Sequence, residues 1–403
     1  MNLTSYKKEL EEELGRILHY WMNVCVDDVD GGFYGRIDGD NKVIPEASKG
    51  VVLNSRILWT FSAAAHSTKE PSFLPVAQRA YTYLLDHFLD KTYGGVYWSL
   101  DHRGAPLNDR KQIYGLAFCL YGFSEYYRAT GQQGVLDEAI RLFRLIERYS
   151  YDHERKGYYE AFARDWAPLE DWRLSGKDAN VPKTMNTHLH ILEAYGNLYR
   201  VWPDPLLLAQ IKGLLEVFFR YMIAETTGHL ILFFEEDWTV RSSMVSYGHD
   251  VEAAWLLQEA ATIIGDGEWI EKTGQLALKM ALAAAEGLDT NGGLWYERGE
   301  RGLAETAADH LVREKHWWPQ AEAMIGFFNA WQAGGDEIWL QRSLASWEFV
   351  KNYIRDSKGG EWWWGVDAQH SPMPGQDKAG FWKCPYHNGR ACMEIIRRLN
   401  ILM

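Results

Sequence analysis

The chain is dominated by segments whose apolar residues recur at helical spacing. In the first of them Leu10, Leu14, Ile17, Leu18 and Trp21 fall on one face of a helix. Twelve such segments are present, and most pairs of them are separated by longer stretches rich in aromatic residues. The pattern predicts helices near residues 5–22, 49–66, 72–88, 110–130, 134–149, 182–201, 205–223, 248–264, 268–286, 315–333, 336–354 and 385–400.

A second pattern, a glycine followed by an aromatic-rich extended stretch, recurs six times. Alternating aromatics after a glycine are typical of short strands or hairpin arms. Successive copies start 63 to 71 residues apart, which is regular enough to count as an internal repeat. The copies begin at Gly31, Gly94, Gly157, Gly228, Gly292 and Gly359.

Each repeat is therefore predicted as a helix, a long aromatic loop and a second helix, followed by a tight turn, so that the long loops all lie at one end. Six helix pairs close into a ring when the first repeat packs on the last, which removes exposed ends. We predict an all-α fold, an (α/α)6 barrel of twelve helices with short β-hairpins in the loops, formed by residues 1–403 as one catalytic domain. The even-numbered helices, which carry polar residues in their first two turns, are expected to form the inner ring.

Composition narrows the possible partners. The chain has 42 Lys and Arg against 55 Asp and Glu, a net charge of −13, and no basic block that would hold nucleic acid. No apolar run reaches membrane-spanning length, and the first residues are charged helix material, so no membrane partner is expected and a cytoplasmic location is predicted. The four cysteines include no Cys-x-x-Cys pair, which indicates neither a disulfide framework nor a zinc site.

Aromatic content is high, with 19 Trp beside 22 Tyr and 16 Phe. Flat apolar faces suit the C–H faces of sugar rings, and they also fill large cores. Both explanations stay open for any single aromatic residue.

The sixth and eighth predicted helices carry histidines near their starts. His188 and His190 point about 200° apart on a helix and do not chelate one metal, whereas Asn186 and His190 share a face. His249 and Glu252 are three apart, which would let the carboxylate orient the imidazole. No third ligand with metalloenzyme spacing follows, so no metal is predicted.

The other inner helices add further polar and aromatic candidates near the same rim. Arg56 lies in an apolar stretch and needs an acceptor, and Pro385 predicts a helix start that places His387 in the first turn. Each residue alone is explained by a paired or core position, such as Arg56 bonded to Glu322. Together they describe a polar pocket with groups that titrate near neutral pH. The remaining candidates are Tyr114, Trp317, Trp318 and Glu322.

These motifs resemble the N-acylglucosamine 2-epimerase superfamily and, within it, the cellobiose 2-epimerases. The resemblance covers nearly the whole chain and is carried by residues 53–59, 183–190, 245–250, 317–322 and 382–390. It implies an (α/α)6 barrel that converts the reducing-end glucose of a β-1,4-linked disaccharide such as cellobiose or lactose to mannose, with no metal or nucleotide in the catalytic step.

The resemblance also implies residue roles. His249 and His387 correspond to the acid/base pair, His190 to a helper at the substrate oxygens, and Arg56 to the cation beside the reacting oxygen. The sugar-binding set is Tyr114, Asn186, Asp178, Glu252, Trp317, Trp318, Glu322 and Trp382, with Asp178 directed to the second sugar. The resemblance also implies a glutamate at the reducing end, for which Glu297 and Glu305 are the alternatives.

Elementary chemistry agrees with these roles. The C2 hydrogen of an aldose becomes removable only after ring opening, when the aldehyde accepts the electrons, and an imidazole with a pKa of about 6.5 both gives and takes protons at neutral pH. Arg56 would stabilise the charge of the cis-enediolate. Two histidines on different helices allow reprotonation on the opposite face.

Several alternatives remain at this point. Mannose-type monosaccharide 2-epimerases and aldose–ketose isomerases share most of these residues. A glycoside hydrolase would need two carboxylates, for which Asp178, Glu252 and Glu322 are candidates, and a sugar-binding module would need only the aromatics. The expected partner is a small sugar, a disaccharide or mannose, and the protein is expected to be a monomer or a weak homodimer.

Overall fold

The computed structural model describes residues 2–299 and 311–403. In these ranges the twelve predicted helices are all present. They are α1 Leu3–Asn23, α2 Val51–Thr68, α3 Phe73–Tyr83, α4 Ile113–Thr130, α5 Gln133–Tyr149, α6 Met185–Tyr199, α7 Pro205–Val217, α8 Tyr247–Ile264, α9 Gly267–Ala284, α10 Trp317–Gly334, α11 Glu337–Phe349 and α12 Tyr386–Leu402. Short π-helical segments continue α3, α7 and α11 over Leu84–Phe88, Phe218–Met222 and Val350–Ile354, and a 3₁₀ turn, Ala285–Gly287, continues α9.

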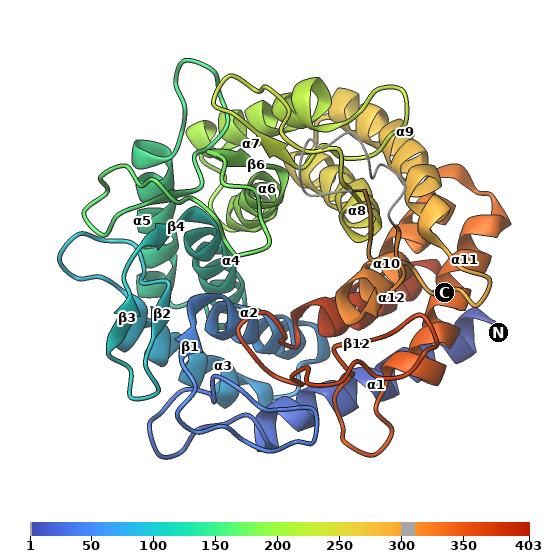
Figure 1. The fold of residues 1–403 in the computed structure, drawn as a ribbon, viewed down its shortest axis with the longest axis horizontal. Helices are drawn as coiled ribbons and strands as arrows, with labels where there is room; N and C mark the ends of the chain where they lie inside the picture. Colours follow the sequence, from blue (N-terminus) through green and yellow to red (C-terminus); the bar gives the residue numbers. More distant parts are fainter. Residues whose placement is uncertain (1, 300–310) are drawn as a thin grey trace.

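The even-numbered helices form a closed inner ring and the odd-numbered helices surround it (Figure 1). Each inner helix packs on the next, from α2 to α4 and onward until α12 packs on α2. The inner helices are buried on nearly all sides, as expected of helices in the middle of a core, whereas an outer helix such as α5 buries one face only. The predicted (α/α)6 barrel is confirmed.

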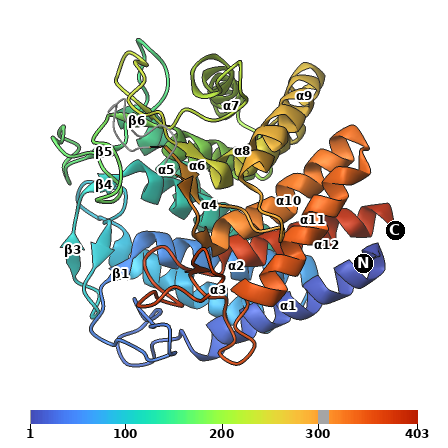
Figure 2. The same ribbon diagram turned by 45° about the vertical axis from the view of Figure 1, so that its right-hand side comes forward.

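The long loops and short strands gather at one end of the barrel, and both termini lie toward the other end (Figure 2). The strands are β1 Lys49–Gly50, β2 Ser99–Leu100, β3 Pro106–Asn108, β4 Lys111–Gln112, β5 Ala161–Phe162, β6 Lys183–Thr184, β7 Phe233–Phe234, β8 Val245–Ser246, β9 Glu297–Arg298, β10 Leu311–Val312, β11 Lys315–His316 and β12 Gly365–Val366. No helix in the described ranges has both the length and the apolar character needed to cross a bilayer.

The glycine of each repeat makes a tight turn at the start of a small hairpin. Five of the six repeats place their first glycine at a positive φ, for example +80° at Gly31, and the sixth uses Gly360 at +92° in place of Gly359. Glycine adopts this conformation without the clash that a Cβ would cause. Antiparallel bridges follow in every repeat, from Val26 with Phe33 to Arg355 with Trp362. The predicted repeat is therefore a structural one.

The inner helices α2, α4, α6 and α10 begin two or three residues later than predicted, because the residues before them form strands. β1 pairs with β2, β4 with β5, β6 with β7, β8 with β9 and β11 with β12, so each repeat is joined to the next. A bridge between Ile37 and Ala379 joins the first loop to the last and closes the circle. Pairing across repeats is a tertiary effect that helical periodicity does not report.

Buried Lys–Asp pairs fasten the start of most inner helices. Lys49 Nζ lies 2.7 Å from Asp27 Oδ2, and both side chains are almost fully buried. Equivalent pairs join Lys111 to Asp90, Lys183 to Asp152 and Lys315 to Asp289. In the fourth repeat Val245 and Ala224 occupy the equivalent positions, and a His229–Asp250 pair fills this role instead.

Candidate active site

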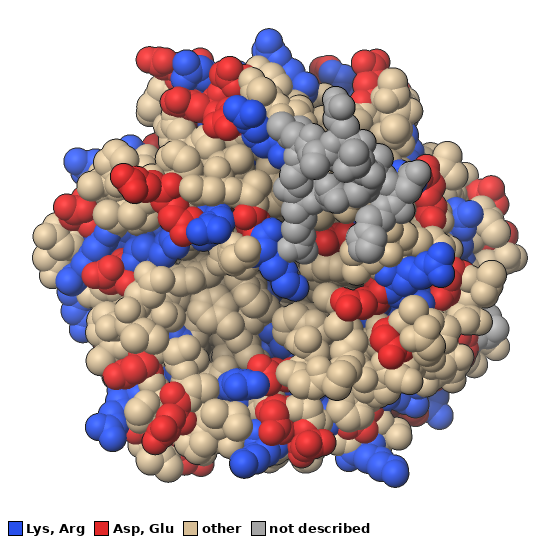
Figure 3. Space-filling model, in the orientation of Figure 1, with Lys and Arg blue, Asp and Glu red and all other residues tan. Residues whose placement is uncertain are grey.

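A cavity of about 460 Å³ opens in the middle of the loop face, where Figure 3 shows a hollow walled mainly by uncharged side chains. All of the predicted site residues except Glu322 line this cavity. They come from α2, α4, α6, α8, α10 and α12 and from two loops. The closed ring thus brings together residues that are more than 300 positions apart in the sequence.

His387 lies in the first turn of α12, as predicted from Pro385, and is almost completely buried. Its Nδ1 lies 2.7 Å from Glu322 Oε1. Burial lowers the pKa of His387 well below its ordinary value, and the positive charges of Arg56 and Arg390 lower it further. His387 is therefore a neutral imidazole held from behind by a carboxylate.

His190 is held in the same way by a residue of its own helix. Its Nδ1 lies 2.9 Å from Glu193 Oε2, one turn along α6. Burial lowers the pKa of His190, although Glu193 acts in the opposite direction. His188 faces away from the cavity, with Nδ1 2.6 Å from the Thr184 carbonyl and Nε2 accepting from the Tyr158 amide.

His249 departs from the predicted arrangement. Its Nδ1 lies 2.7 Å from Ser246 Oγ, and the expected contact with Glu252 is not made because Glu252 accepts from Arg390 Nη2 at 2.7 Å. Burial lowers the pKa of His249 to about 3, with a further contribution from His190. The prediction that Glu252 orients His249 is thus wrong, and Ser246 occupies that position.

The three site histidines, His190, His249 and His387, have the same ring orientation. Each Nδ1 bonds a side chain behind it, and within the described ranges no protein group hydrogen-bonds the Nε2. A carboxylate accepts and does not donate, so His190 and His387 carry their proton on Nδ1. Both therefore present the unprotonated Nε2 as their remaining basic site.

Trp318 lies between the two histidines of the predicted acid/base pair. Its ring centroid is 4.6 Å from that of His249 and 5.7 Å from that of His387. This follows from the order of the ring, because α10 stands between α8 and α12. His249 and His387 therefore approach the cavity from either side of one indole.

Arg56 supplies a cation at the same level of the barrel. Its Nη2 donates to Tyr114 Oη at 2.8 Å, and its guanidinium stacks 4.2 Å from the Phe118 centroid and 4.8 Å from that of Tyr386. Arg56 Nε has no partner among the described residues, and the alternative pairing with Glu322 is not formed. The guanidinium is thus buried without a direct partner among the carboxylates that the structure describes.

Other polar atoms also reach the cavity with bonding capacity left. Asn186 Oδ1 and Trp317 Nε1 are buried and lack a partner within the described ranges. An unsatisfied buried polar atom costs about 1–3 kcal/mol, so a ligand that bonds them recovers this energy. The Trp382 ring stands edge-on to Tyr114 at 5.9 Å and completes an aromatic wall.

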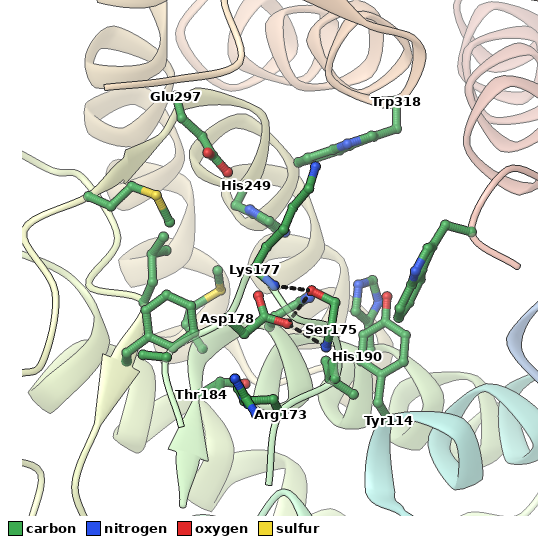
Figure 4. A pocket seen from close by; sticks show the side chains of 18 of the residues that line it. Tyr114, Arg173, Ser175, Lys177, Asp178, Thr184, His190, His249, Glu297 and Trp318 are labelled. Atoms are coloured by element: carbon green, nitrogen blue, oxygen red, sulfur yellow. Dashed lines mark hydrogen bonds between the residues drawn. The ribbon is translucent and has the colours of Figure 1, made fainter. Parts of the chain in front are cut away.

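The segment 172–181 forms one side of the mouth of the cavity, and Asp178 lies on it (Figure 4). Asp178 Oδ2 accepts from the backbone N and the Oγ of Ser175 at 2.9 and 2.8 Å. These bonds fold the segment on itself and leave Oδ1 without a recorded partner among the described residues. Asp178 lies on the segment that leads into α6, the helix that carries His190, and it lines the same cavity.

Glu322 does not line the cavity, unlike the other predicted sugar-binding residues. It is fully buried, and it accepts from His387, Arg390 and the Trp255 indole. Ligand atoms of Glu252, Glu322 and His387 lie within 4.8 Å of one another, a grouping that could hold a cation. The Arg390 guanidinium donates to both carboxylates at 2.7 Å and already supplies positive charge there.

The comparison with known families covers most of the barrel. The family model described as N-acylglucosamine 2-epimerase (GlcNAc 2-epimerase) matches residues 32–391. The chain belongs to this family.

Full-length relatives agree. A cellobiose 2-epimerase of Bacteroides fragilis is 49% identical over 97% of this chain and 98% of its own length. A cellobiose 2-epimerase of Dictyoglomus turgidum is 38% identical over 99% of this chain and 100% of its own length. The solved structure of the cellobiose 2-epimerase from Bacillus thermoamylovorans B4167 superposes with a TM-score of 0.92 at 38% identity, covering 98% of this chain and 100% of that one.

Several lining residues of this family member were missed in the sequence. Tyr296 stacks on His316 with centroids 3.9 Å apart, and His316 in turn meets Trp364 at 6.0 Å. Tyr296 and Trp364 belong to the glycine–aromatic repeats, so their repeat position was the available signal. Glu297 also lines the cavity, whereas Glu305 lies outside the described residues.

Proposed function

We propose that this protein interconverts the reducing-end glucose and mannose of β-1,4-linked disaccharides such as cellobiose and lactose. The observation that carries the proposal is the set of three neutral histidines around one cavity, each bonded through Nδ1 and open at Nε2. Neutral imidazoles are the bases that proton abstraction beside a carbonyl requires near neutral pH.

Ring opening comes first. A base removes the proton of the O1 hydroxyl while a proton is delivered to O5, so that the C1–O5 bond breaks and an aldehyde forms. His190, next to Tyr114 with centroids 5.1 Å apart, and Arg56 lie where sugar oxygens would be held. The Arg56 guanidinium then stabilises negative charge on the oxygen at C1.

Epimerisation follows at C2. One imidazole Nε2 takes the C2 proton, the electron pair moves into the C1–C2 bond, and a cis-enediolate forms with its charge on oxygen. The second imidazole, which has taken up a proton from solvent, returns that proton to C2 from the opposite face, and the first imidazolium releases its proton to solvent, so that both histidines end the cycle neutral. His249 and His387, separated by Trp318, are suited to these two roles because they approach from different helices. Carbon is neither oxidised nor reduced overall, so the side chains suffice without a redox cofactor or a metal.

The size of the site fits a disaccharide. Cavities of roughly 300–1,000 Å³ enclose small ligands, and this cavity holds about 460 Å³. In our proposal Trp318 and Trp382 pack against the reducing-end sugar, and Asp178 on the segment 172–181 contacts the second sugar. The identity of 49% to a full-length cellobiose 2-epimerase supports the disaccharide over free mannose.

A hydrolase needs two carboxylates that face the sugar from opposite sides. Glu322 is enclosed by Arg390, His387 and Trp255, and Glu252 bonds the same guanidinium. A hydrolase mechanism would also leave the three histidines with open Nε2 atoms without a role, and both points favour the epimerase. We further propose a cytoplasmic monomer or weak homodimer, in keeping with four free, buried cysteines.

Proton NMR of cellobiose, lactose and mannose, each incubated in D2O with enzyme treated with a chelator, tests the proposal. The expected result is the C2 epimer of cellobiose and lactose, carrying deuterium at C2, formed faster than any product from mannose. Release of free glucose without exchange at C2 would identify a hydrolase. Mannose as the fastest substrate would move the protein to the monosaccharide epimerases or isomerases.

A further inference from the structure

Arg390 lies one helical turn beyond His387 on α12 and does not line the substrate cavity. Its side chain is only 3% exposed. It is nevertheless bonded to three carboxylates from three other inner helices, Glu193 of α6, Glu252 of α8 and Glu322 of α10. A guanidinium shared by so many carboxylates at the centre of a barrel requires an explanation.

Two of those carboxylates are the partners of site histidines. Glu193 accepts from His190 Nδ1 at 2.9 Å, and Glu322 accepts from His387 Nδ1 at 2.7 Å. Arg390 Nη1 donates to Glu193 Oε1, and Arg390 Nη2 donates to Glu322 Oε1 at 2.7 Å. One planar side chain thus connects the backs of two imidazoles that lie on different helices.

We propose that Arg390 is a positioning residue that holds the His190–Glu193 and His387–Glu322 pairs in the protonation state needed for catalysis. Its positive charge favours the ionised form of both carboxylates against the effect of burial, and its hydrogen bonds aim them at Nδ1, so that each imidazole stays neutral with Nε2 open to the sugar. This role rests on the proposed epimerase function and adds to it a residue that touches no substrate.

The charge balance of the cluster supports this role. Three buried carboxylates face the guanidinium of Arg390, and Arg56 is the other guanidinium at this level. Without Arg390 the carboxylates would recover neutrality by taking up protons or by drawing protons onto the imidazoles. Either change alters the catalytic groups, because an imidazolium does not abstract a proton and a protonated carboxyl no longer fixes Nδ1–H.

The other titratable groups around the two pairs come from every inner helix. From α2, α4 and α8 they are Arg56, Tyr114, Tyr121, His249 and Glu252. Cys384 lies beside Arg56, and Tyr386 lies next to Arg390 itself and bonds both Glu193 oxygens through its Oη. The phenols and the thiol have pKa values raised by burial and stay neutral, so Arg390 is the cation in direct contact with the carboxylates.

The structure also offers a way to replace the guanidinium. A second cavity of about 170 Å³, lined by Arg390, Glu193, Trp59, Trp255, Arg128 and Arg397, lies on the other side of the cluster from the substrate cavity. Several of its lining side chains, such as that of Arg397, are half exposed, so it communicates with solvent. A guanidinium ion therefore has a route to the space that a truncated Arg390 would leave.

The first experiment compares Arg390→Gln, Arg390→Lys and the control Arg128→Gln. Arg128 lines the same second cavity and pairs with Glu125, away from the histidines. We expect Arg390→Gln to lower kcat about 100-fold with little change in KM, and to move the acid limb of the kcat profile upward by about one pH unit. Arg390→Lys should fall between Arg390→Gln and wild type, and Arg128→Gln should match wild type.

The second experiment measures turnover of Arg390→Ala with added guanidinium chloride at concentrations that leave wild type folded. Partial recovery is expected for Arg390→Ala and not for Arg390→Gln, whose side chain fills the space. An unshifted pH profile together with no recovery would overturn the proposal. These results are distinct from failure of the proposed function, because in that case wild type itself would not epimerise cellobiose.

A measurement on wild type covers the case in which the variants do not fold. Nitrogen NMR of ¹⁵N-histidine-labelled protein, assigned with His190→Gln and His387→Gln, reports which ring nitrogen carries the proton. We expect both residues in the neutral form with the proton on Nδ1 across pH 6 to 8. A proton on Nε2, or an imidazolium at neutral pH, would contradict the role given to Arg390.

Discussion

Two histidine–glutamate pairs of the site show what the helical spacing of residues predicts and what it does not. His190 with Glu193 and His249 with Glu252 have the same separation of three, which places both partners on one helical face. The first pair forms a hydrogen bond and the second does not, because Arg390 engages Glu252. A local rule identified the candidates, and a residue 138 positions away decided between them.

The two histidines beside Trp318 are expected to act on the rate of the chemical step, whereas Trp318 itself is expected to act mainly on sugar binding. His249→Asn is expected to reduce kcat at least about 100-fold while binding of cellobiose changes little, because the amide fills part of the ring's space without its basicity. Turnover and calorimetric binding measure the two effects. Normal turnover in His249→Asn would contradict the proposed acid/base pair, and Trp318→Phe, expected to act mainly on KM, serves as the comparison.

The depressed histidine pKa values make a prediction for stability. The pKa of His249 is about 3 in the folded chain and about 6.5 in the unfolded chain. The contribution of neutral His249 to the unfolding free energy is therefore fully present above pH 6.5 and is lost as the pH falls below that value. Between pH 7 and 5 the unfolding free energy of wild type should decrease by about 2 kcal/mol relative to His249→Asn. Urea unfolding at both pH values checks this, and a constant difference would refute it.

The same values predict the pH dependence of catalysis. A base must be unprotonated, and burial lowers the pKa of His190, His249 and His387 below the ordinary value of about 6.5. The acid limb of kcat/KM, which reports the free enzyme, should therefore lie below pH 6.5. A profile that falls already at pH 7 would be inconsistent with this environment.

At the scale of elements, the starts of the inner helices carry the site, and buried ion pairs hold those starts. Asp27 is an example of such an ion pair. Its Oδ2 accepts a hydrogen bond from Lys49, and its Oδ1 accepts from the backbone amides of Val29 and Asp30 in the turn. The lysine stands two residues before α2, in the strand that pairs with the next repeat. Each ion pair thus connects a turn, a strand and a helix start.

Removal of one partner should be costly. Lys49→Met leaves Asp27 buried without its cation, and we expect a loss of about 3–5 kcal/mol in unfolding free energy. The control Lys8→Met breaks an exposed pair with Glu12, and we expect a change of at most about 0.5 kcal/mol. Chemical denaturation measures both variants. Equal, small effects would mean that the buried pair does not stabilise the helix start.

At the scale of the whole molecule, closure of the ring determines where α12 stands. Glu361, fully buried, accepts from the Trp21 indole of α1 and, at 2.7 Å, from the Asn388 amide of α12. Lys383 Nζ lies 3.2 Å from the same carboxylate. The first helix and the last loop therefore together fix the residue that follows His387.

Glu361→Leu should accordingly affect both stability and catalysis. It leaves an indole, an amide and an ammonium group buried without their acceptor, so we expect a loss of about 3–5 kcal/mol and a lower kcat from a displaced His387. Thermal unfolding and turnover are the measurements. The matched variant Glu348→Leu, at a half-exposed pair with Lys351, should change neither.

The sequence by itself determined the elements. Helical periodicity gave twelve segments, and the glycine–aromatic repeat gave six units with their loops at one end, because both signals are local and repeat along the chain. Polar residues in the first turns of the inner helices indicated a part of the cavity lining. The repeat positions of Tyr296 and Trp364 are a local signal of the same kind.

Only the tertiary structure decided how these parts meet. It replaced the starts of inner helices with strands that pair across repeats, and it placed Glu322 behind His387 instead of in the cavity. In the folded chain Ser246 also forms the hydrogen bond with His249, and Arg390 connects Glu193, Glu252 and Glu322. The physical reason is that a buried charge bonds whichever partner the packing brings within reach, and in a closed ring that partner comes from a distant part of the chain.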